Sequence, residues 1–316
     1  MNINKSEDLA DKTLWIGLSK IEDLGAQTFC ELLKVFGNPR NIYAASFQQL
    51  KAVVADHIAT EISRGVNEET LAESMRWLSL ENNFLVTLAD SHYPKSLLEI
   101  TDPPPVLYAK GKLALLNQPS IAIIGSRNAT TQGKENAEAF AKGLSSFGLC
   151  IVSGLALGID GAAHRGAMQA NGSTIAVAAT GLDIVYPSKH LDLAHQIAKH
   201  GLLISEFALG ETLKPQNFPR RNRLISGLSL GCLVVEASLQ SGSQITARLA
   251  TEQGREVFVI PGSIHSPTSK GCHQLIKQGA KLVDNLQDII EDLNLSNLSM
   301  MQTNASEVPT DHKLNS

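Results

Sequence analysis

The 316-residue sequence contains only four cysteines, and they lie far apart. No two of them form the Cys-x-x-Cys spacing that structural zinc sites and many redox sites use. The sequence therefore indicates neither a zinc site nor a disulfide framework. The simpler expectation is four buried, reduced thiols, with no metal and no cofactor. The cysteines are Cys30, Cys150, Cys232 and Cys272.

Long hydrophobic runs are absent as well. No stretch reaches the ~20 consecutive apolar residues that a membrane-spanning helix needs. The N-terminal segment, MNINKSEDLADK, is polar and acidic, whereas a secretion signal begins with a basic segment followed by an apolar one. We therefore expect a cytoplasmic protein with no membrane partner.

The chain also lacks an excess of positive charge. Its 27 Lys and Arg against 31 Asp and Glu give a formal net charge of −4, which argues against a nucleic-acid partner for the chain as a whole. The two parts of the chain differ, however. Residues 1–110 hold 10 basic and 15 acidic side chains, whereas residues 111–316 hold 17 and 16. The acidity therefore belongs to the N-terminal part, which becomes a candidate surface for protein partners.

With 43% hydrophobic residues, a chain of this length can bury a large core and divide into about two domains. Apolar positions recur at three-to-four spacing through residues 8–82, which predicts a small all-helical domain over residues 1–82, with a longer amphipathic segment at 67–81. Residues 83–118 form a connector and lead-in. It contains a proline-rich stretch at 102–105, followed by a short predicted strand at 106–109.

From residue 120 onward the pattern changes to short apolar runs that alternate with helix-like segments. Near-continuous apolar strands of this kind are typical of a parallel sheet covered by helices on both faces. We therefore predict an α/β fold, a doubly wound Rossmann-like domain over residues 119–293, followed by a disordered tail at 294–316. The expected strands are 121–124, 149–152, 174–178, 202–204, 232–235 and 257–260, with a seventh at 281–283.

Small and polar residues follow these strands, at the edge of the sheet where an open α/β fold binds its ligands. The first loop is not the dinucleotide motif G-x-G-x-x-G, because Ser126 and Arg127 replace the glycine-rich turn. An arginine after such a turn favours an anion. Ser241, Gly242 and Ser243 open a later helix and offer hydroxyls and amides to a phosphate, although an ordinary helix cap is the alternative. The candidate contacts in these loops are Gly125, Ser126, Arg127, Gly154, Ser241, Gly242 and Ser243.

The most distinctive segment is KPQNFPRRNR at 214–223. It carries four positive charges, and no acidic residue lies between Glu211 and Glu236. An aromatic ring among arginines suits single-stranded nucleic acid, because a base stacks on the ring while guanidinium groups hold phosphates. The alternative is a solvated basic face with the ring in the core. The candidate contacts are Phe218, Arg220, Arg221, Asn222 and Arg223.

Two further titratable residues admit a catalytic interpretation. His164 lies one turn after Asp160, and a helix capped by Asp160 explains both residues better than a metal site. Glu236 is either a general acid or base or a loop-orienting acceptor, and both interpretations stay open. Neither a two-metal carboxylate cluster nor a nucleophile–histidine–acid set can be assembled, so we expect a binding protein rather than an enzyme.

The sequence contains the strings IAIIGSRNAT, IVSGLALGIDGAAHRGAM, TIAVAATGLDIVYP, LISEF, FPRRNRLISGLS, LVVEASLQSGSQITARLATEQGREVFVIPGS and GCHQLIKQGA, with YPKSLLEITDPPPVLYAKG upstream. Taken together, these strings resemble the DNA-processing protein A family (DprA, also called Smf), over roughly residues 93–284. The resemblance implies a cytosolic protein that binds single-stranded DNA during natural transformation, protects it from nucleases and loads a RecA-type recombinase. It also implies a homodimer formed through the Rossmann-like domain and a sterile-alpha-motif-like N-terminal domain.

In this resemblance, the family's G-S-R loop falls on Gly125, Ser126 and Arg127, and its F-x-x-R-N-R segment on 218–223. Two departures stand out: Gln244 replaces an apolar residue, and no winged-helix domain is expected after the Rossmann-like one. Two other functions remain open. One is a nucleotide-processing enzyme similar to phosphoribohydrolases, with Glu236 as its acid or base, and the other is a pure interaction protein.

Overall fold

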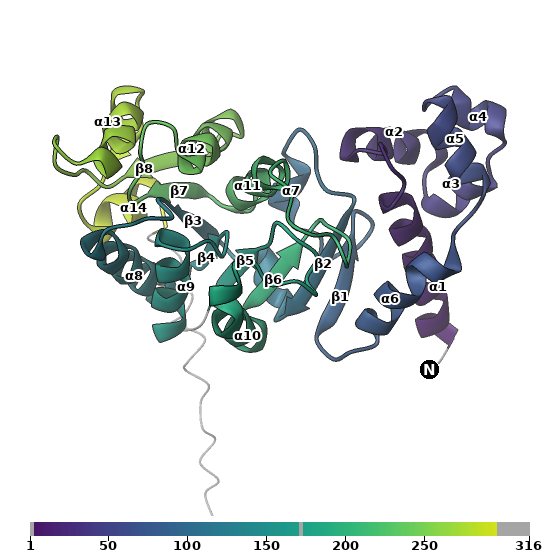
Figure 1. Ribbon diagram of the computed structural model, residues 1–316, viewed down its shortest axis with the longest axis horizontal. Coiled ribbons are helices and arrows are strands. Elements are labelled where there is room, and N and C mark those ends of the chain that lie inside the picture. The colour runs from purple at the N-terminus through teal and green to yellow at the C-terminus, as the bar shows by residue number, and fades with distance from the viewer. Residues whose placement is uncertain (1–2, 171–172, 296–316) are drawn as a thin grey trace, which may run out of the picture.

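The structure is a computed structural model that describes residues 3–170 and 173–295 (Figure 1). Its centre is one sheet, in which the described strands follow the order β1-β2-β6-β5-β4-β3-β7-β8-β9. The strands are β1 (Asn83–Thr87), β2 (Val106–Gly111), β3 (Ser120–Ile124), β4 (Cys150–Ser153), β5 (Thr174–Val177), β6 (Leu202–Ser205), β7 (Gly231–Val234), β8 (Glu256–Val259) and β9 (Lys281–Leu282).

The strands from β3 to β9 all run parallel, whereas β2 is antiparallel to both of its neighbours, β1 and β6. This arrangement confirms the predicted doubly wound α/β fold, and each expected strand matches a strand of the sheet within one or two residues. Strand β1 was not predicted. The sheet therefore extends into the lead-in segment instead of beginning at residue 120.

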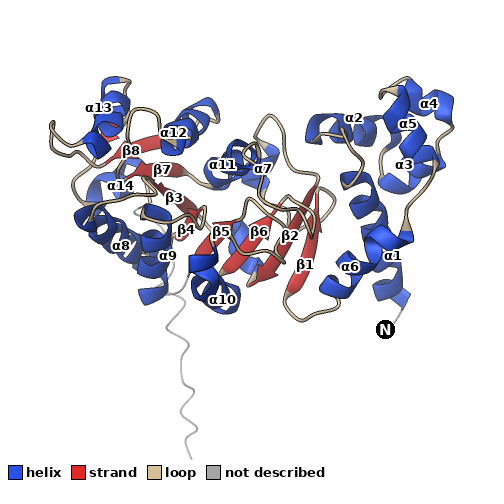
Figure 2. Cartoon of the chain, in the orientation of Figure 1, coloured by secondary structure: helices blue, strands red, loops and turns tan. Residues whose placement is uncertain are grey.

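Helices cover both faces of the sheet (Figure 2). Apolar residues of α7, α11, α12 and α13 pack on one face, and those of α8, α9 and α14 pack on the other, together with α10 near β5 and β6. Because both faces are buried, β3 to β7 have no exposed position. These helices are α7 (Lys95–Leu98), α8 (Thr131–Ser146), α9 (Ile159–Gln169), α10 (Leu191–His200), α11 (Asn217–Leu228), α12 (Gly242–Glu252), α13 (Lys270–Lys277) and α14 (Leu286–Asp292).

The N-terminal part is helical, as predicted. Trp15 stacks on Phe29 in its core, with ring centroids 5.6 Å apart, and Trp77 meets Tyr108 of β2 edge-on at 5.9 Å. The helices therefore share a continuous core with the sheet. They lie beside β1 in Figure 1. They are α1 (Ile3–Ser19), α2 (Ala26–Phe36), α3 (Pro39–Ala44), α4 (Phe47–Lys51), α5 (Asp56–Ser63) and α6 (Glu68–Leu78).

Helix α6 ends three residues before the predicted limit of 81. The Asn83 side chain donates a hydrogen bond of 2.8 Å to the carbonyl oxygen of Trp77. This bond occupies a carbonyl of the last turn and directs the chain into β1 instead of a further helical turn.

The four cysteines are free thiols, and Cys150, Cys232 and Cys272 are buried as expected, whereas Cys30 is half-buried. Most of the predicted disordered tail, residues 296–316, lies outside the described residues. Leu295, at its start, is buried against the face that α8 and α14 cover. In the described ranges, no helix combines the length and apolar character that a membrane crossing requires.

Candidate functional site

The candidate site lies at the carboxyl ends of the parallel strands. From β3 the chain first builds β4, β5 and β6 on one side and then returns to place β7 on the other side of β3. At such a reversal the connecting loops diverge to opposite faces and leave a crevice. Gly125, Ser126 and Arg127 follow β3 there, and Glu236 follows β7 by two residues.

Glu236 holds the loop after β3 in place. Its carboxylate accepts hydrogen bonds from the Thr130 amide at 3.0 Å and the Thr130 hydroxyl at 2.5 Å, and its carbonyl accepts from the Ser126 amide at 2.8 Å. Thr130 in turn caps α8 by accepting from the Gly133 amide. These contacts support the loop-orienting interpretation, because they keep both carboxylate oxygens of Glu236 on Thr130.

Arg127 and Phe218, which lie far apart in the sequence, meet in the structure. The Arg127 guanidinium carbon is 4.4 Å from the centroid of the Phe218 ring, a cation–π contact. Arg127 is exposed and Phe218 is half-buried. The Asn217 side chain fixes the start of α11 by donating to the carbonyl oxygen of Ala179 at 3.1 Å. Two of the predicted contacts therefore form one surface.

Tyr186 belongs to the same surface, although the sequence did not single it out. Its ring centroid lies 6.3 Å from that of Phe218, with 59° between the ring planes, and 46% of the residue is exposed. The only signal in the sequence was an aromatic residue in a loop after a predicted strand. Such a residue stands out only when the tertiary contact with Phe218 is known.

Arg221 points into the protein. Its guanidinium donates to the carbonyl oxygens of Gly154 and Val177, the latter at 2.8 Å, and to the Asn222 side chain at 2.9 Å. Burial lowers the pKa of Arg221 to about 10, with the Asp160 carboxylate opposing this effect. A Cβ atom on Gly154 would lie 2.2 Å from Nη1 of Arg221. Gly154, Arg221 and Asn222 therefore join α11 to the ends of β4 and β5, inside the molecule.

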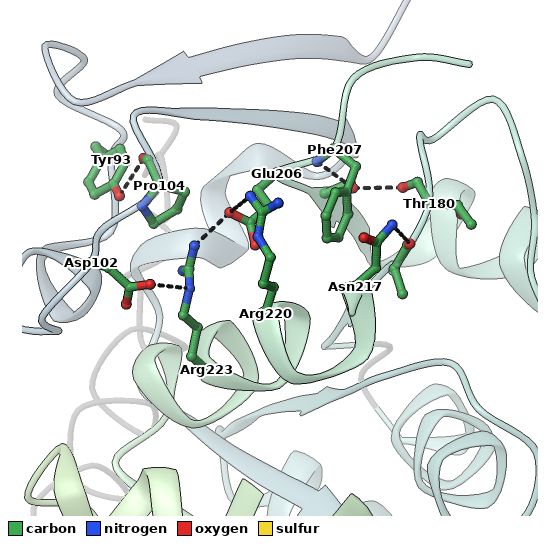
Figure 3. A network of polar contacts seen from close by, with 11 residues as sticks. Tyr93, Asp102, Pro104, Thr180, Glu206, Phe207, Asn217, Arg220 and Arg223 are labelled. Atoms are coloured by element: carbon green, nitrogen blue, oxygen red, sulfur yellow. Dashed lines mark hydrogen bonds and ion pairs between the residues drawn. The ribbon is translucent and has the colours of Figure 1, made fainter. Parts of the chain in front are cut away.

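Arg223 and Arg220 both reach the buried carboxylate of Glu206 (Figure 3). The distance to Oε2 is 2.6 Å from Arg223 and 3.4 Å from Arg220, and Asp102 of the proline-rich connector lies 2.9 Å from Nε of Arg223. The Arg223 side chain is 7% exposed, whereas that of Arg220 is 54% exposed. Burial raises the pKa of the Glu206 carboxyl, and the two arginines act against this. Arg223 is thus an internal ion-pair partner, while Arg220 faces solvent.

The turn at Ser241, Gly242 and Ser243 forms the N-terminus of α12, which packs beside α11. The hydroxyls of Ser241 and Ser243 are 2.7 Å apart, and the Ser241 side chain makes no capping bond. A Cβ atom on Gly242 would meet no other atom within 4 Å. Packing therefore does not demand a glycine here, and the turn leaves space above the helix N-terminus.

His164 is fully buried, and Nδ1 lies 2.7 Å from the Thr174 hydroxyl. That hydroxyl donates to the carbonyl oxygen of Ile151, so it accepts from His164 Nδ1. The expected cap by Asp160 is wrong: Gly158 is the N-cap of α9, and Asp160 in its first turn accepts from the amides of Gly154 and Ala156. Across the described residues, no three His, Cys, Asp or Glu side chains are grouped for a metal ion.

The fold and these contacts define a Rossmann-like protein in which arginine and aromatic side chains meet beside the carboxyl ends of the parallel strands. Residues 84–294 match the model of the family described as DNA recombination-mediator protein A, and the chain belongs to this family. It is 40% identical over 286 residues to Protein Smf of Escherichia coli K12, covering 90% of this chain and 76% of that one. It is 48% identical over 206 residues to DNA processing protein DprA of Streptococcus pneumoniae R6, covering 65% and 73%.

Solved structures agree with this assignment. The X-ray structure of DNA processing protein A from Streptococcus pneumoniae is 38% identical to this chain with a TM-score of 0.79, covering 88% of this chain and 97% of that one. A DNA processing protein A from Helicobacter pylori, whose single-stranded DNA binding mode was studied, is 34% identical with a TM-score of 0.61, covering 67% and 96%. The family resemblance and the fold predicted from the sequence are therefore confirmed.

Proposed function

We propose that this protein binds single-stranded DNA across the surface that Arg127, Phe218 and Tyr186 form beside the carboxyl ends of the parallel strands. The observation that carries the proposal is the contact between the exposed Arg127 guanidinium and the Phe218 ring. An arginine plane on an aromatic ring offers both a stacking surface for a base and a charge for a phosphate. The single-stranded DNA binding mode of the Helicobacter pylori relative supports the same ligand.

The predicted DNA contacts take different parts in this proposal. Arg127, Phe218 and Arg220 contact the strand directly, because each has surface in reach of solvent. Phosphates lie near the amide of Gly125 and the hydroxyl of Ser126 and, further along the strand, near the turn at Ser241, Gly242 and Ser243. The remaining predicted residues support the site from inside the protein. They are Gly154, Arg221, Asn222 and Arg223. To touch a phosphate, Arg221 and Arg223 would have to leave their buried partners.

We also propose that the bound strand is incoming DNA in natural transformation, and that the protein protects it and loads a RecA-type recombinase. The description of the family as a recombination mediator supports this role, as do the DNA processing proteins among its relatives. The acidic helical part at residues 3–78 is our candidate surface for a protein partner, because its charge makes it a poor neighbour for phosphates.

Salt dependence tests the DNA site. For a single strand, the logarithm of affinity falls with that of salt by about 0.7 per phosphate neutralised. Arg127→Ala is expected to reduce this slope by about 0.7, and Phe218→Ala to weaken binding by about 1–3 kcal/mol with little change in slope. Duplex DNA should bind more weakly than the single strand. The measurement is fluorescence anisotropy at several salt concentrations.

The control for these variants is Phe47→Ala, which removes an aromatic ring that is 37% exposed on the helical part. It should leave both affinity and slope unchanged. An unchanged slope in Arg127→Ala would remove this residue from the phosphate contacts. Recombinase loading on protein-coated strands provides a second readout, since Phe218→Ala should impair it in proportion to the lost binding.

We propose further that the Rossmann-like domain forms a homodimer through an apolar patch beside α12 and α13. Leu239, Ile245 and Ile264 are 57%, 37% and 66% exposed, and Leu239 lines neighbouring hollows with both isoleucines. Exposed apolar side chains that gather in this way mark an interaction surface. Leu239→Asp is therefore expected to halve the mass measured by light scattering. Leu80→Asp, at a residue 58% exposed on the helical part, is the matched control and should remain dimeric.

A further inference from the structure

The loop that carries Tyr186 holds the exposed ring in a defined position. Before the tyrosine, the Asp183 carboxylate accepts from the Gly210 amide, with distances of 3.0 and 3.1 Å to its two oxygens. After the tyrosine, the ring of the buried His190 makes a 2.8 Å hydrogen bond to the carbonyl oxygen of Leu155. The loop is therefore tied to the protein on both sides of Tyr186. A ring presented in this way loses little conformational entropy when it binds a ligand.

The angle between the two aromatic rings limits what they can bind. Stacking requires nearly parallel planes, whereas the planes of Tyr186 and Phe218 differ by 59°. A base that stacks on Phe218 therefore cannot stack on Tyr186 as well. The ring centroids are 6.3 Å apart, so the two rings can stack on neighbouring bases of one strand. Because the rings are tilted, each of them stacks on a different base.

We propose that Tyr186 is a second base-stacking residue and that the site takes two neighbouring bases that are tilted away from each other. This inference rests on the proposed binding of single-stranded DNA, and it specifies which strand conformation the two rings can bind. Bases in a duplex, or in a strand with strong internal stacking, lie parallel to their neighbours and must be unstacked before they fit. The site therefore selects unpaired strands with weak internal stacking, such as thymine runs, over duplexes and over adenine runs.

The experiment measures the affinity of the full chain for labelled oligonucleotides of thymine and of adenine by fluorescence anisotropy. The wild type is expected to prefer thymine. Tyr186→Ala should weaken binding to thymine by about 5-fold or more and bring the two affinities closer together. Tyr186→Phe keeps the ring and should stay within about 2-fold of the wild type. Phe47→Ala is the control for loss of an exposed ring elsewhere.

A second measurement removes single bases from the thymine strand. With the wild type, loss of the base at either of two neighbouring positions should weaken binding. With Tyr186→Ala, loss at one of these positions should no longer matter, which a merely structural role of the tyrosine would not produce. The inference about Tyr186 is overturned if Tyr186→Ala binds like the wild type while Phe218→Ala binds weakly. If the wild type does not bind single strands at all, the proposed function is wrong, and the inference about Tyr186 is overturned with it.

Discussion

Replacing Glu206 with alanine is expected to lower the free energy of unfolding by about 3–5 kcal/mol. The carboxylate is 4% exposed and lies 2.6 Å from the Arg223 guanidinium, which is itself 7% exposed. Without Glu206, a buried positive charge keeps only Asp102, which is 38% exposed. Nη1 of Arg223 already has no hydrogen-bond partner. The desolvation cost of the guanidinium would then have little compensation, and urea denaturation measures the loss.

Arg220→Ala is the matched control, because Arg220 reaches the same carboxylate from the surface. Its side chain is 54% exposed and its distance to Glu206 is 3.4 Å, so its loss should cost less than about 1 kcal/mol. The double replacement Glu206→Leu with Arg223→Met removes both buried charges and should recover most of the stability. A loss below about 1 kcal/mol in Glu206→Ala would show that the buried pair does not hold α11 against the loop that follows β6.

Lowering the pH is expected to destabilise the folded protein through His164. Burial lowers the pKa of His164 to about 3, whereas a histidine in an unfolded chain titrates near about 6.5. Between these values the unfolded chain binds a proton that the folded protein does not. The contribution of His164 to stability is therefore complete above about pH 6.5 and is lost as the pH falls, by about 1.4 kcal/mol per unit, or about 3 kcal/mol at pH 4.

His164→Asn tests this prediction, since an amide can still donate to the Thr174 hydroxyl, which lies 2.7 Å from Nδ1. Unfolding free energies of both proteins are measured between pH 7 and pH 4. Carboxyl groups such as Glu206 are common to the two proteins, so the difference between them isolates His164. The gap should change by about 3 kcal/mol over this range in favour of the variant. A gap that is independent of pH would contradict the assignment.

The parallel strands could be predicted because of their burial. Strands covered by helices on both faces consist of continuous apolar runs, and such runs are visible without knowledge of the partner strands. β1 escaped prediction for the opposite reason. It lies at the edge of the sheet, and its pairing partner β2 follows only after the proline-rich connector. Only this antiparallel pairing identifies residues 83–87 as a strand of the same sheet.

The sequence predicted which residue types make up the candidate site better than it predicted the directions of their side chains. The four positive charges of 214–223 are evident in the sequence, because charge density is a local property. The direction of each guanidinium depends on residues from distant segments. Glu206 and Asp102 draw Arg223 inward, and the carbonyl oxygens of Gly154 and Val177 hold Arg221. No spacing within the segment itself contains this information.

The sequence by itself was enough to identify the helical and α/β parts of the chain and the family to which it belongs. It also showed that the cysteines are few and scattered. These properties depend on composition, periodicity and contiguous motifs. The tertiary structure decided which side chains form a surface. It placed Arg127 over Phe218, brought Tyr186 beside them, and turned Arg221 and Arg223 into the protein. The physical reason is that burial and pairing are set by groups that meet only when the sheet has folded.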